Sequence, residues 1–319
     1  MKKHTLEFEK PLRELETKIN ELETISQSGK IGIEKEITKL RRKLNKLHRD
    51  TYANLSRWQC VQLARHPNRP YTLDYIKLIT TDFVEFKGDR NFRDDKAIIA
   101  GIGRWNDQPV AIIGHQKGRG TKDNLKRNFG MSHPEGYRKA LRIMKLAEKF
   151  GLPVITLIDT PGAYPGLGAE ERGQASAIAE NLMAMANLKV PIIAVVIGEG
   201  GSGGALALGI ADRVYMLQYA IYSVISPEGC ASILYRDAAQ APQAADAMKI
   251  TASDLLEFGI VDGLIEEPLG GAHYDPEMAA SVISKTVTDA LDKLKTLNPK
   301  KRIKMRINKY MKMGQWIEN

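Results

Sequence analysis

The feature that most constrains this chain is an apolar run that leads directly into a cluster of glycines. Residues 192–197 read Ile-Ile-Ala-Val-Val-Ile, residues 198–204 contain five glycines, and Ala205-Leu206-Ala207-Leu208 follow. A short, continuous run of this kind predicts a strand buried on both faces of a parallel sheet. The glycines leave backbone N–H groups uncovered where a helix is predicted to begin. The sequence therefore predicts an α/β protein with an anion-binding turn after a buried strand.

Short apolar runs and helical stretches alternate through most of the chain, which is typical of a mostly parallel sheet covered by helices. Two runs, at 97–102 and 110–114, flank Asn106-Asp107-Gln108-Pro109 and predict a β-hairpin. The other strands are expected at 154–158, 192–197, 214–217, 221–225 and 260–265, and the helices at 134–150, 169–188, 203–210 and 276–297. Pro134 and Gly151 suit the first turn and the end of the helix between them.

The first fifty residues predict a helical hairpin. Apolar residues recur every three or four positions in two runs, which is the spacing of a seam between helices. The seams consist of Leu12, Leu15, Ile19 and Leu22, and of Ile33, Ile37, Leu40, Leu44 and Leu47. A turn is expected between them at Gln27-Ser28-Gly29-Lys30-Ile31-Gly32. Either a partner subunit or the body of the same chain could cover the apolar stripe.

Composition limits the class of protein. The 319 residues are 43% hydrophobic, enough for a sizeable core, and no apolar run approaches the about 18 residues of a membrane span. With only Cys60 and Cys230, and no signal-like N-terminus, we expect a cytoplasmic protein without a disulfide scaffold. The net charge of +9 favours polyanionic partners. Much of the excess lies in a C-terminal run of Lys300, Lys301, Arg302, Lys304, Arg306, Lys309 and Lys312.

The glycine turn admits two chemical interpretations. In the first, backbone N–H groups stabilise a developing oxyanion or bind a phosphate. The donors would be Gly203, Gly204 and Ala205. In the second, the run Gly200–Gly204 is a G-x-S-x-G nucleophile elbow, with Ser202 as the nucleophile of a serine hydrolase. That elbow needs an acid and a histidine further along the chain, where His273 is the only histidine, so the oxyanion interpretation is favoured.

Two further loops are candidates for substrate contacts. Asp159-Thr160-Pro161-Gly162-Ala163-Tyr164-Pro165-Gly166 follows the strand expected at 154–158, and ligands bind at the carboxyl ends of parallel strands. The loop Gly114-His115-Gln116-Lys117-Gly118-Arg119-Gly120-Thr121-Lys122 is basic and suits a phosphate or a carboxylate, although it lacks P-loop spacing. A rigid structural loop and a solvated charge run are the respective alternatives. The candidate substrate-binding residues are Gly162, Ala163, Tyr164, Lys117 and Arg119, and no spacing typical of a metal site is found in the sequence.

Six segments of the chain carry a resemblance that covers nearly its whole length. They are Arg65-His66-Pro67-Asn68-Arg69-Pro70, Gly114-His115-Gln116-Lys117-Gly118, Asn128-Phe129-Gly130-Met131, Asp159–Gly166, Gly198–Ala205 and Ile225-Ser226-Pro227-Glu228-Gly229-Cys230-Ala231. In these segments the chain closely resembles the carboxyltransferase alpha subunits of bacterial acetyl-CoA carboxylases. The resemblance implies a crotonase/Clp-protease-like α/β superhelix of β-β-α units with an N-terminal helical hairpin. We expect an assembly region at 1–70, a carboxyltransferase core at 71–297 and a basic tail at 298–319.

The resemblance also implies an activity and a set of partners. Carboxybiotin on a biotin carboxyl carrier protein would give its carboxyl group to acetyl-CoA, which yields malonyl-CoA for fatty acid synthesis. The glycine turn would then stabilise negative charge on the ureido oxygen of biotin. A zinc-ribbon beta subunit would supply most of the acyl-CoA side of the site in an alpha2beta2 assembly. A separate biotin carboxylase would use the ATP. Neither a metal nor ATP is therefore expected in this chain. Binding of RNA through the basic tail is retained as a secondary possibility.

Overall fold

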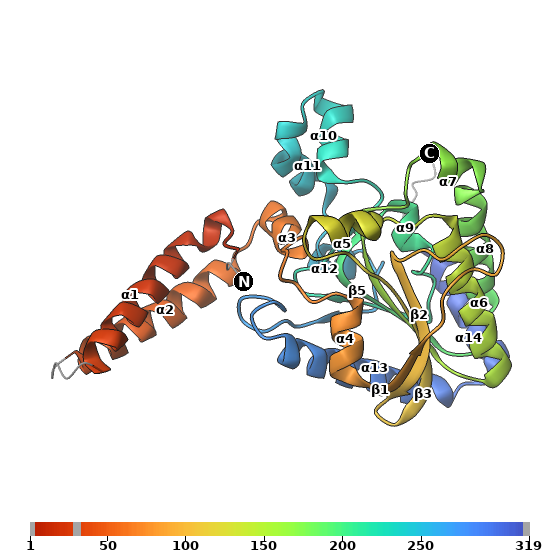
Figure 1. The fold of residues 1–319 in the computed structure, drawn as a ribbon, viewed down its shortest axis with the longest axis horizontal. Coiled ribbons are helices and arrows are strands. Elements are labelled where there is room, and N and C mark those ends of the chain that lie inside the picture. Colours follow the sequence, from red (N-terminus) through yellow and green to blue (C-terminus); the bar gives the residue numbers. More distant parts are fainter. Residues whose placement is uncertain (1–3, 28–32, 315–319) are drawn as a thin grey trace.

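The fold is built on one mixed sheet of eight strands (Figure 1). The computed structural model describes residues 4–27 and 33–314. The strands are β1 (Thr80–Glu85), β2 (Ile98–Trp105), β3 (Gln108–His115), β4 (Val154–Thr160), β5 (Ile192–Gly201), β6 (Arg213–Leu217), β7 (Ile221–Ser223) and β8 (Gly263–Ile265). Their order is β1-β2-β3-β4-β5-β6-β8, and β7 pairs with the end of β5. The pairs β1–β2 and β2–β3 are antiparallel, whereas all pairs from β3 onwards are parallel.

Helices cover both sides of the sheet. They are α1 (Lys10–Gln27), α2 (Glu34–Ala53), α3 (Arg57–Ala64), α4 (Thr72–Ile79), α5 (Thr121–Lys126), α6 (Pro134–Phe150), α7 (Leu167–Glu171), α8 (Gln174–Asn187), α9 (Ser202–Leu206), α10 (Pro227–Tyr235), α11 (Ala241–Met248), α12 (Ala252–Glu257), α13 (Pro276–Lys295) and α14 (Pro299–Met311). Single 3₁₀ turns are η1 (Glu7–Glu9), η2 (Asn128–Gly130) and η3 (Ala238–Gln240). Helices α6 and α8 pack together on one side of the sheet, and α4 packs against α13 on the other (Figure 1). The α/β expectation is confirmed.

Most expected elements are present, with informative differences at their ends. The hairpin β2–β3 and the helix at 134–150 are confirmed, and Gly151 ends that helix in the left-handed conformation at φ 67°. The helix expected at 169–188 is wrong as a single element, because Gly173 at φ 79° separates α7 from α8. The helix expected at 203–210 is shorter than predicted. The strand β5 runs on to Gly201, and α9 has only five residues.

The N-terminal helical hairpin is confirmed, although its turn at 28–32 lies outside the described residues. Helices α1 and α2 pack against each other and project from the body of the molecule (Figure 1). At their base, Leu12 and Tyr52 join a small core with Val61 and Leu63 of α3. There the Tyr52 hydroxyl donates to the buried Glu9 carboxylate at 2.5 Å. The base of the hairpin is therefore anchored on its own chain.

The basic C-terminal segment forms helix α14, and two of its arginines are buried in the body of the protein. Arg306 is 1% exposed and pairs with Asp212 at 2.7 Å. It also donates hydrogen bonds to the backbone carbonyls of Met185, Leu188 and Val190, which end α8 and lead into β5. Arg302 is 4% exposed. These two charges stabilise the fold and are not available to a polyanion.

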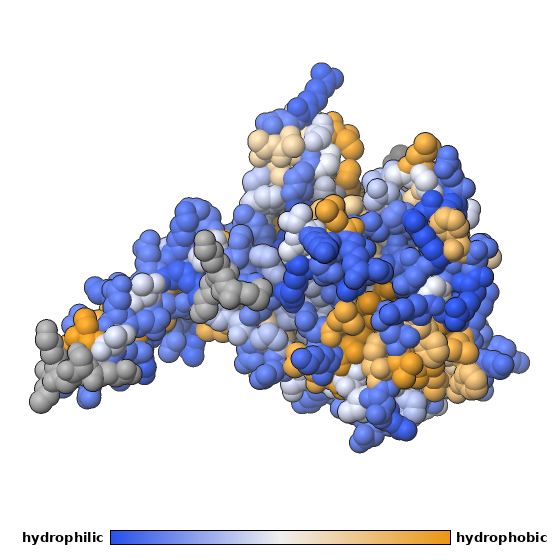
Figure 2. Space-filling view, in the orientation of Figure 1, coloured by the Kyte–Doolittle hydropathy of each residue, from blue (hydrophilic) through white to orange (hydrophobic). Residues whose placement is uncertain are grey.

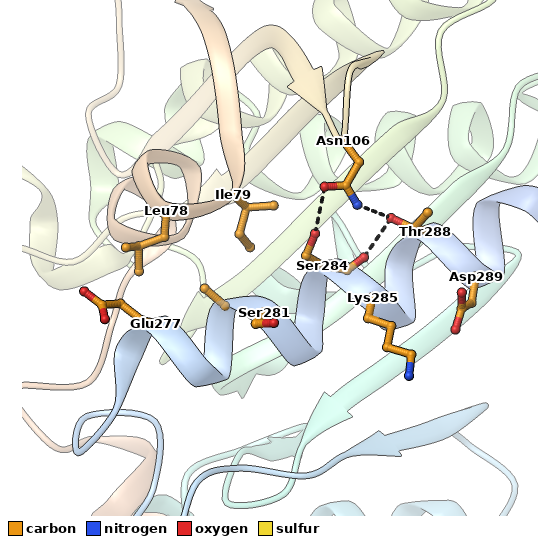
Figure 3. Close-up of a pocket in the computed structure, with 10 residues that line it drawn as sticks. Leu78, Ile79, Asn106, Glu277, Ser281, Ser284, Lys285, Thr288 and Asp289 are labelled. Carbon is orange, nitrogen blue, oxygen red and sulfur yellow. Dashed lines mark hydrogen bonds between the residues drawn. The ribbon is translucent and has the colours of Figure 1, made fainter.

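A hollow of about 530 Å³ lies between α13 and the turn that joins β2 to β3 (Figure 3). In it, the Asn106 side-chain amide donates to Thr288 Oγ1 at 2.9 Å. Asn106 precedes the amino end of β3, so this hollow lies at the edge of the sheet opposite the carboxyl ends of the parallel strands. Within the described residues, no helix combines the length and apolar character needed to cross a membrane.

The position of Arg306 leads to a prediction about stability. Replacing Arg306 with Met removes an ion-pair partner of the buried Asp212 and three hydrogen bonds to backbone carbonyls. Because one member of a buried pair is lost, the free energy of unfolding should fall by about 3–5 kcal/mol. Urea unfolding should show this loss, whereas Lys304→Met, an exposed change on the same helix, should lie within about 0.5 kcal/mol of wild type. Equal midpoints for the two variants would contradict the structural role of α14.

Candidate active site

The two glycine loops that the sequence singled out meet at the carboxyl edge of the sheet. Strands β4 and β5 are parallel neighbours, so the loops that follow them lie side by side. A Cβ atom on Gly204 would lie 2.5 Å from the carbonyl carbon of Gly162, and one on Gly201 would lie 2.2 Å from the carbonyl oxygen of Pro161. These distances are too short for any side chain. Backbone therefore packs on backbone, which only glycine allows at Gly201 and Gly204.

Free N–H groups are present at the glycine turn. Gly203 and Gly204 lie in the first turn of α9, where the N–H groups of an α-helix have no acceptor within the helix, and no side chain caps this turn. Ala205 is fully buried beside them. By contrast, Gly162 already donates its N–H to Thr160 Oγ1 at 3.1 Å. The candidate donors at the turn are thus the Gly203 and Gly204 amides. Because α9 has only five residues, its dipole adds little to the effect of these N–H groups.

The structure does not assemble a serine triad. Ser202 is exposed and has a left-handed φ of 52° at the strand-to-helix junction, as a nucleophile elbow would. His273, however, stacks on His66 with ring centroids 3.9 Å apart, and its Nε2 lies 3.9 Å from a carboxylate oxygen of Glu9. It is therefore engaged at the base of the N-terminal hairpin. The geometry supports Ser202 as a turn residue.

Lys117 lies inside the protein, between two carboxylates. Its ammonium group is 2.6 Å from Asp159 Oδ1 and 3.4 Å from Glu199 Oε2. Asp159 Oδ1 also accepts the backbone N–H of Glu199 at 2.9 Å. Asp159 begins the loop that contains Gly162, and Glu199 precedes the glycine turn. The charge of Lys117 is thus neutralised within the protein, and the residue joins the two loops.

Two more of the six sequence segments are connected to the same group of charges. Arg65 donates to Glu199 at 2.7 Å and to Glu228, at the start of α10, at 2.5 Å. Lys117, Asp159, Glu199, Arg65 and Glu228 will be called the site ion network. Each of its members comes from a different segment singled out in the sequence. The family resemblance had marked each of these segments, but the sequence did not reveal that their charged side chains pair with one another.

The pairing within the site ion network favours the charged forms of Glu199 and Lys117. Burial by itself would raise the pKa of Glu199, but attraction to Lys117 and Arg65 outweighs this effect and holds the pKa below its usual value. Burial would likewise lower the pKa of Lys117, but the carboxylates of Asp159 and Glu199 outweigh it and raise that pKa. Each charge therefore depends on its partners for its ionisation.

His115 lies beneath the glycine turn as a neutral group. It is fully buried, and its Nδ1 accepts the N–H of Asp159 at 3.4 Å. Burial lowers the pKa of His115 to about 3, against a smaller opposing effect of the backbone of Gly204. The uncharged imidazole supports the turn without adding charge to it.

Tyr164 and Arg119 lie at the rim of the site. The Tyr164 ring stacks on His133 at 4.1 Å, and its backbone N–H donates to Ser132 at 3.0 Å. Arg119 stacks on Tyr71 and pairs with Asp74 at 2.6 Å. The structure therefore brings Tyr164 close to the glycine turn. The guanidinium group of Arg119, in contrast, is paired with Asp74 of the same chain.

One cluster of possible metal ligands is found in the described part of the chain. Ligand atoms of Asp95, His133 and Glu135 lie within 4.8 Å of one another. The Glu135 carboxylate is paired with Arg172 and Arg138, and the backbone N–H of His133 donates to Asp95 Oδ2 at 3.0 Å. Because these charges already have protein partners, the cluster is explained as a support for the His133 ring.

A groove with apolar walls opens beside the turn. It has a volume of about 300 Å³. Its lining consists of Ser202, Gly203, Leu206, Tyr222, Ser223, Val224, Leu255 and Ile260. Val224 is 83% exposed, so one wall of the groove is open to solvent. The candidate oxyanion donors therefore lie at the edge of an uncovered apolar surface.

Comparison with solved structures defines the class of the fold. The transcarboxylase 12S hexamer superposes with a TM-score of 0.57 at 22% identity, over 72% of this chain and 43% of that chain. The beta subunit of geranyl-CoA carboxylase from P. aeruginosa superposes with a TM-score of 0.55 at 18% identity, over 75% of this chain and 44% of that chain. This chain thus spans less than half of either structure. The fold of this chain is thus shared with part of these transcarboxylase and carboxylase structures.

Sequence comparison then gives the family. The family described as acetyl co-enzyme A carboxylase carboxyltransferase-like matches residues 5–314, so the chain belongs to it and is a transferase. The acetyl-coenzyme A carboxylase carboxyl transferase subunit alpha of Pseudoalteromonas atlantica is 58% identical over 97% of this chain and 98% of its own length. The protein of the same name from Pasteurella multocida is 56% identical over 98% and 99%. The resemblance inferred from the sequence is confirmed.

The site ion network leads to a prediction that depends on pH. In the wild type, the pKa of Glu199 is lower in the folded protein than its value of about 4.5 in the unfolded chain. The ionised Glu199 therefore contributes to stability above pH 4.5, and this contribution is lost as the pH falls through the pKa of the folded state. Replacing Lys117 with Met leaves two buried carboxylates short of positive charge and should cost about 3–5 kcal/mol at pH 8. At pH 5 the cost should be smaller, because the Glu199 carboxyl, without the attraction of Lys117, is then closer to protonation.

Urea unfolding at the two pH values measures this difference. Lys145→Met, an exposed change on α6, serves as the control and should have little effect at either pH. A destabilisation by Lys117→Met that is equal at pH 5 and pH 8 would show that the pairing with Asp159 and Glu199 is not its cause.

Proposed function

We propose that this chain is the alpha subunit of an acetyl-CoA carboxyltransferase. The carboxyl group would come from carboxybiotin on a carrier protein and would be accepted by acetyl-CoA, giving malonyl-CoA. The proposal is supported by 58% identity over nearly the full length to a relative with that name. The observation that carries it is the pair of Gly203 and Gly204 N–H groups in the first turn of α9, which have no acceptor within that helix.

These N–H groups perform the central task of the proposed mechanism. Fixed donors stabilise negative charge as it develops in a transition state, and loss of one such donor typically lowers the rate by about 10²–10³. The absence of side chains at Gly201 and Gly204 lets the two glycine loops pack backbone on backbone, which holds the donors in a fixed position. The oxyanion site is therefore proposed at Gly203, Gly204 and Ala205, with the first two as donors and the buried Ala205 beside them, and with Gly162, Ala163 and Tyr164 at its rim.

This chain supplies hydrogen-bond donors rather than a base. The titratable groups next to the turn, Lys117, Asp159 and Glu199, are bound to one another, and the pKa of the buried His115 is lowered to about 3. Carboxybiotin would supply the group that is transferred, and the ureido anion left when that carboxyl group departs as CO₂ would be basic enough to take a proton from the acetyl methyl group. The protein then has to hold the donors in place, which the site ion network does. Lys117 is proposed to act in this way rather than by binding substrate, and Arg119 to hold the rim.

The open groove supports a site that is completed by a second chain. An apolar surface beside charge-stabilising donors must be covered, because those donors are more effective where water is excluded. We propose that a zinc-ribbon beta subunit covers it in an alpha2beta2 assembly, and that a carrier protein and a biotin carboxylase act with it in the cytoplasm. Residues 1–70 would serve assembly, 71–297 would form the catalytic core, and 298–319 would complete it.

Reconstitution tests the proposed function. The isolated chain should not transfer carboxyl groups between malonyl-CoA and free biotin, whereas a mixture with a carboxyltransferase beta subunit should do so. The reaction is measured by the formation of acetyl-CoA. Full activity of the isolated chain would contradict the divided site, and inactivity of a well-formed complex would contradict the function.

A small substitution tests the oxyanion turn. In Gly204→Ala the added Cβ would lie 2.5 Å from the carbonyl carbon of Gly162, so the two loops must move apart. We expect kcat to fall at least about 100-fold, as for loss of an oxyanion donor, while the complex still assembles. Gly168→Ala on α7 is the control, because its Cβ would meet only the flexible end of Arg172. Normal turnover in Gly204→Ala would exclude this turn as the oxyanion site.

A further inference from the structure

The segment that follows the Lys117 loop lies directly against the candidate site. It comprises α5 and η2, residues 121–130. A Cβ on Gly130 would lie 2.8 Å from Lys117 Cγ, so the segment rests on the site ion network. Asn128 Nδ2 lies 2.9 Å from His133 Nδ1, and the His133 ring stacks on Tyr164. The segment is thus fixed at two points to groups that border the glycine turn.

The end of this segment has an unfavourable backbone conformation. Asn128, Phe129 and Gly130 have successive φ angles of 47°, 55° and 85°, all in the left-handed region. Asn tolerates this region and Gly favours it, but a bulky residue such as Phe rarely adopts it. Such conformations persist when the surroundings impose them, and they gather at functional sites. Here the result is that Phe129 is 48% exposed.

The surface around Phe129 combines apolar groups with unpaired positive charge. Leu125 on α5 is 62% exposed. Lys122 and Lys126 are exposed on the same helix, and neither forms an ion pair within the described residues, whereas Asp123 pairs with Arg127. Figure 2 shows a small orange area over α5 bordered by dark blue. Lys122, Leu125, Lys126 and Phe129 will be called the α5 face.

We propose that the α5 face is the docking surface for an acidic carrier domain that presents biotin to the site. The proposal rests on the proposed function. The two free lysines complement an acidic partner, and Leu125 and Phe129 offer an apolar centre for the contact. The face adjoins the site through Lys117 and His133, so a carrier docked there would hold its prosthetic group close to the turn. A small face suits a partner that must bind and leave in each cycle.

Direct binding tests this docking surface. The probe is the biotinylated carrier domain with a fluorescent label, titrated with the complex of this chain and its beta subunit, and the readout is anisotropy. Phe129→Ala should raise the Kd at least tenfold. The double variant Lys122→Glu, Lys126→Glu should weaken binding similarly and reduce its dependence on salt. Phe150→Ala, which removes an exposed aromatic ring at the far end of α6, should leave the Kd unchanged. An unchanged Kd in Phe129→Ala would overturn the proposal.

A second substitution separates docking from folding. Phe129→Gly removes the same ring but favours the left-handed conformation, so its melting temperature should equal or exceed that of wild type. Its Kd for the carrier should nevertheless be raised as in Phe129→Ala. A Kd in Phe129→Gly like that of wild type would show that the backbone, not the ring, matters, and would overturn the proposal.

Free biotin distinguishes this proposal from the proposed function. Transfer between malonyl-CoA and free biotin needs no docking surface, so Phe129→Ala should leave its KM and kcat unchanged. If Phe129→Ala lowered the activity equally with free biotin and with the carrier, Phe129 would belong to the substrate site. If the variant released the beta subunit, the α5 face would belong to the contact with that subunit. Either result would overturn carrier docking. Failure of the wild-type complex to use free biotin would instead overturn the proposed function, while carrier binding could still be measured.

Discussion

The ammonium group of Lys117 lies in the interior between Asp159 and Glu199, at 2.6 and 3.4 Å, and the arrangement of the site depends on this contact. Each carboxylate stands at the start of one of the two glycine loops. Three charges away from water are stable only as a set, because each unpaired member would carry a large desolvation cost. The pairing thus fixes the ends of β4 and β5 relative to each other, and Arg65 extends it to α10 through Glu228.

The chemistry proposed for the site follows from what this pairing leaves free. The acidic and basic side chains near the turn are occupied with one another. The groups that line the open groove are therefore Gly203 and an apolar wall that includes Leu206 and Val224, with the amide of Gly204 next in the same helical turn. Backbone donors held by a buried network need no rearrangement during a reaction, which is the property that electrostatic catalysis requires.

Much of the fold could be predicted from the sequence, because its signals are local. The helix at 134–150 has a proline at its start and a glycine at its end, and the structure has the same bounds. The break at Gly173 was missed, since a single glycine in an alanine-rich stretch is compatible with a helix. Lys117 was expected to bind substrate, because its neighbours in the sequence are basic and glycine-rich. Its actual partners, Asp159 and Glu199, are 42 and 82 positions away and carry no local signal.

The sequence by itself determined the α/β class, the family and the position of the glycine turn, because apolar periodicity, glycine spacing and motif identity are properties of neighbouring residues. Only the tertiary structure decided which charges are free. Arg302 and Arg306 belong to a basic run in the sequence but lie buried in the fold, and Lys117 is neutralised inside the site. Whether a charge faces a ligand or a partner within the protein depends on burial and on contacts between distant segments, and these exist only after the chain has folded.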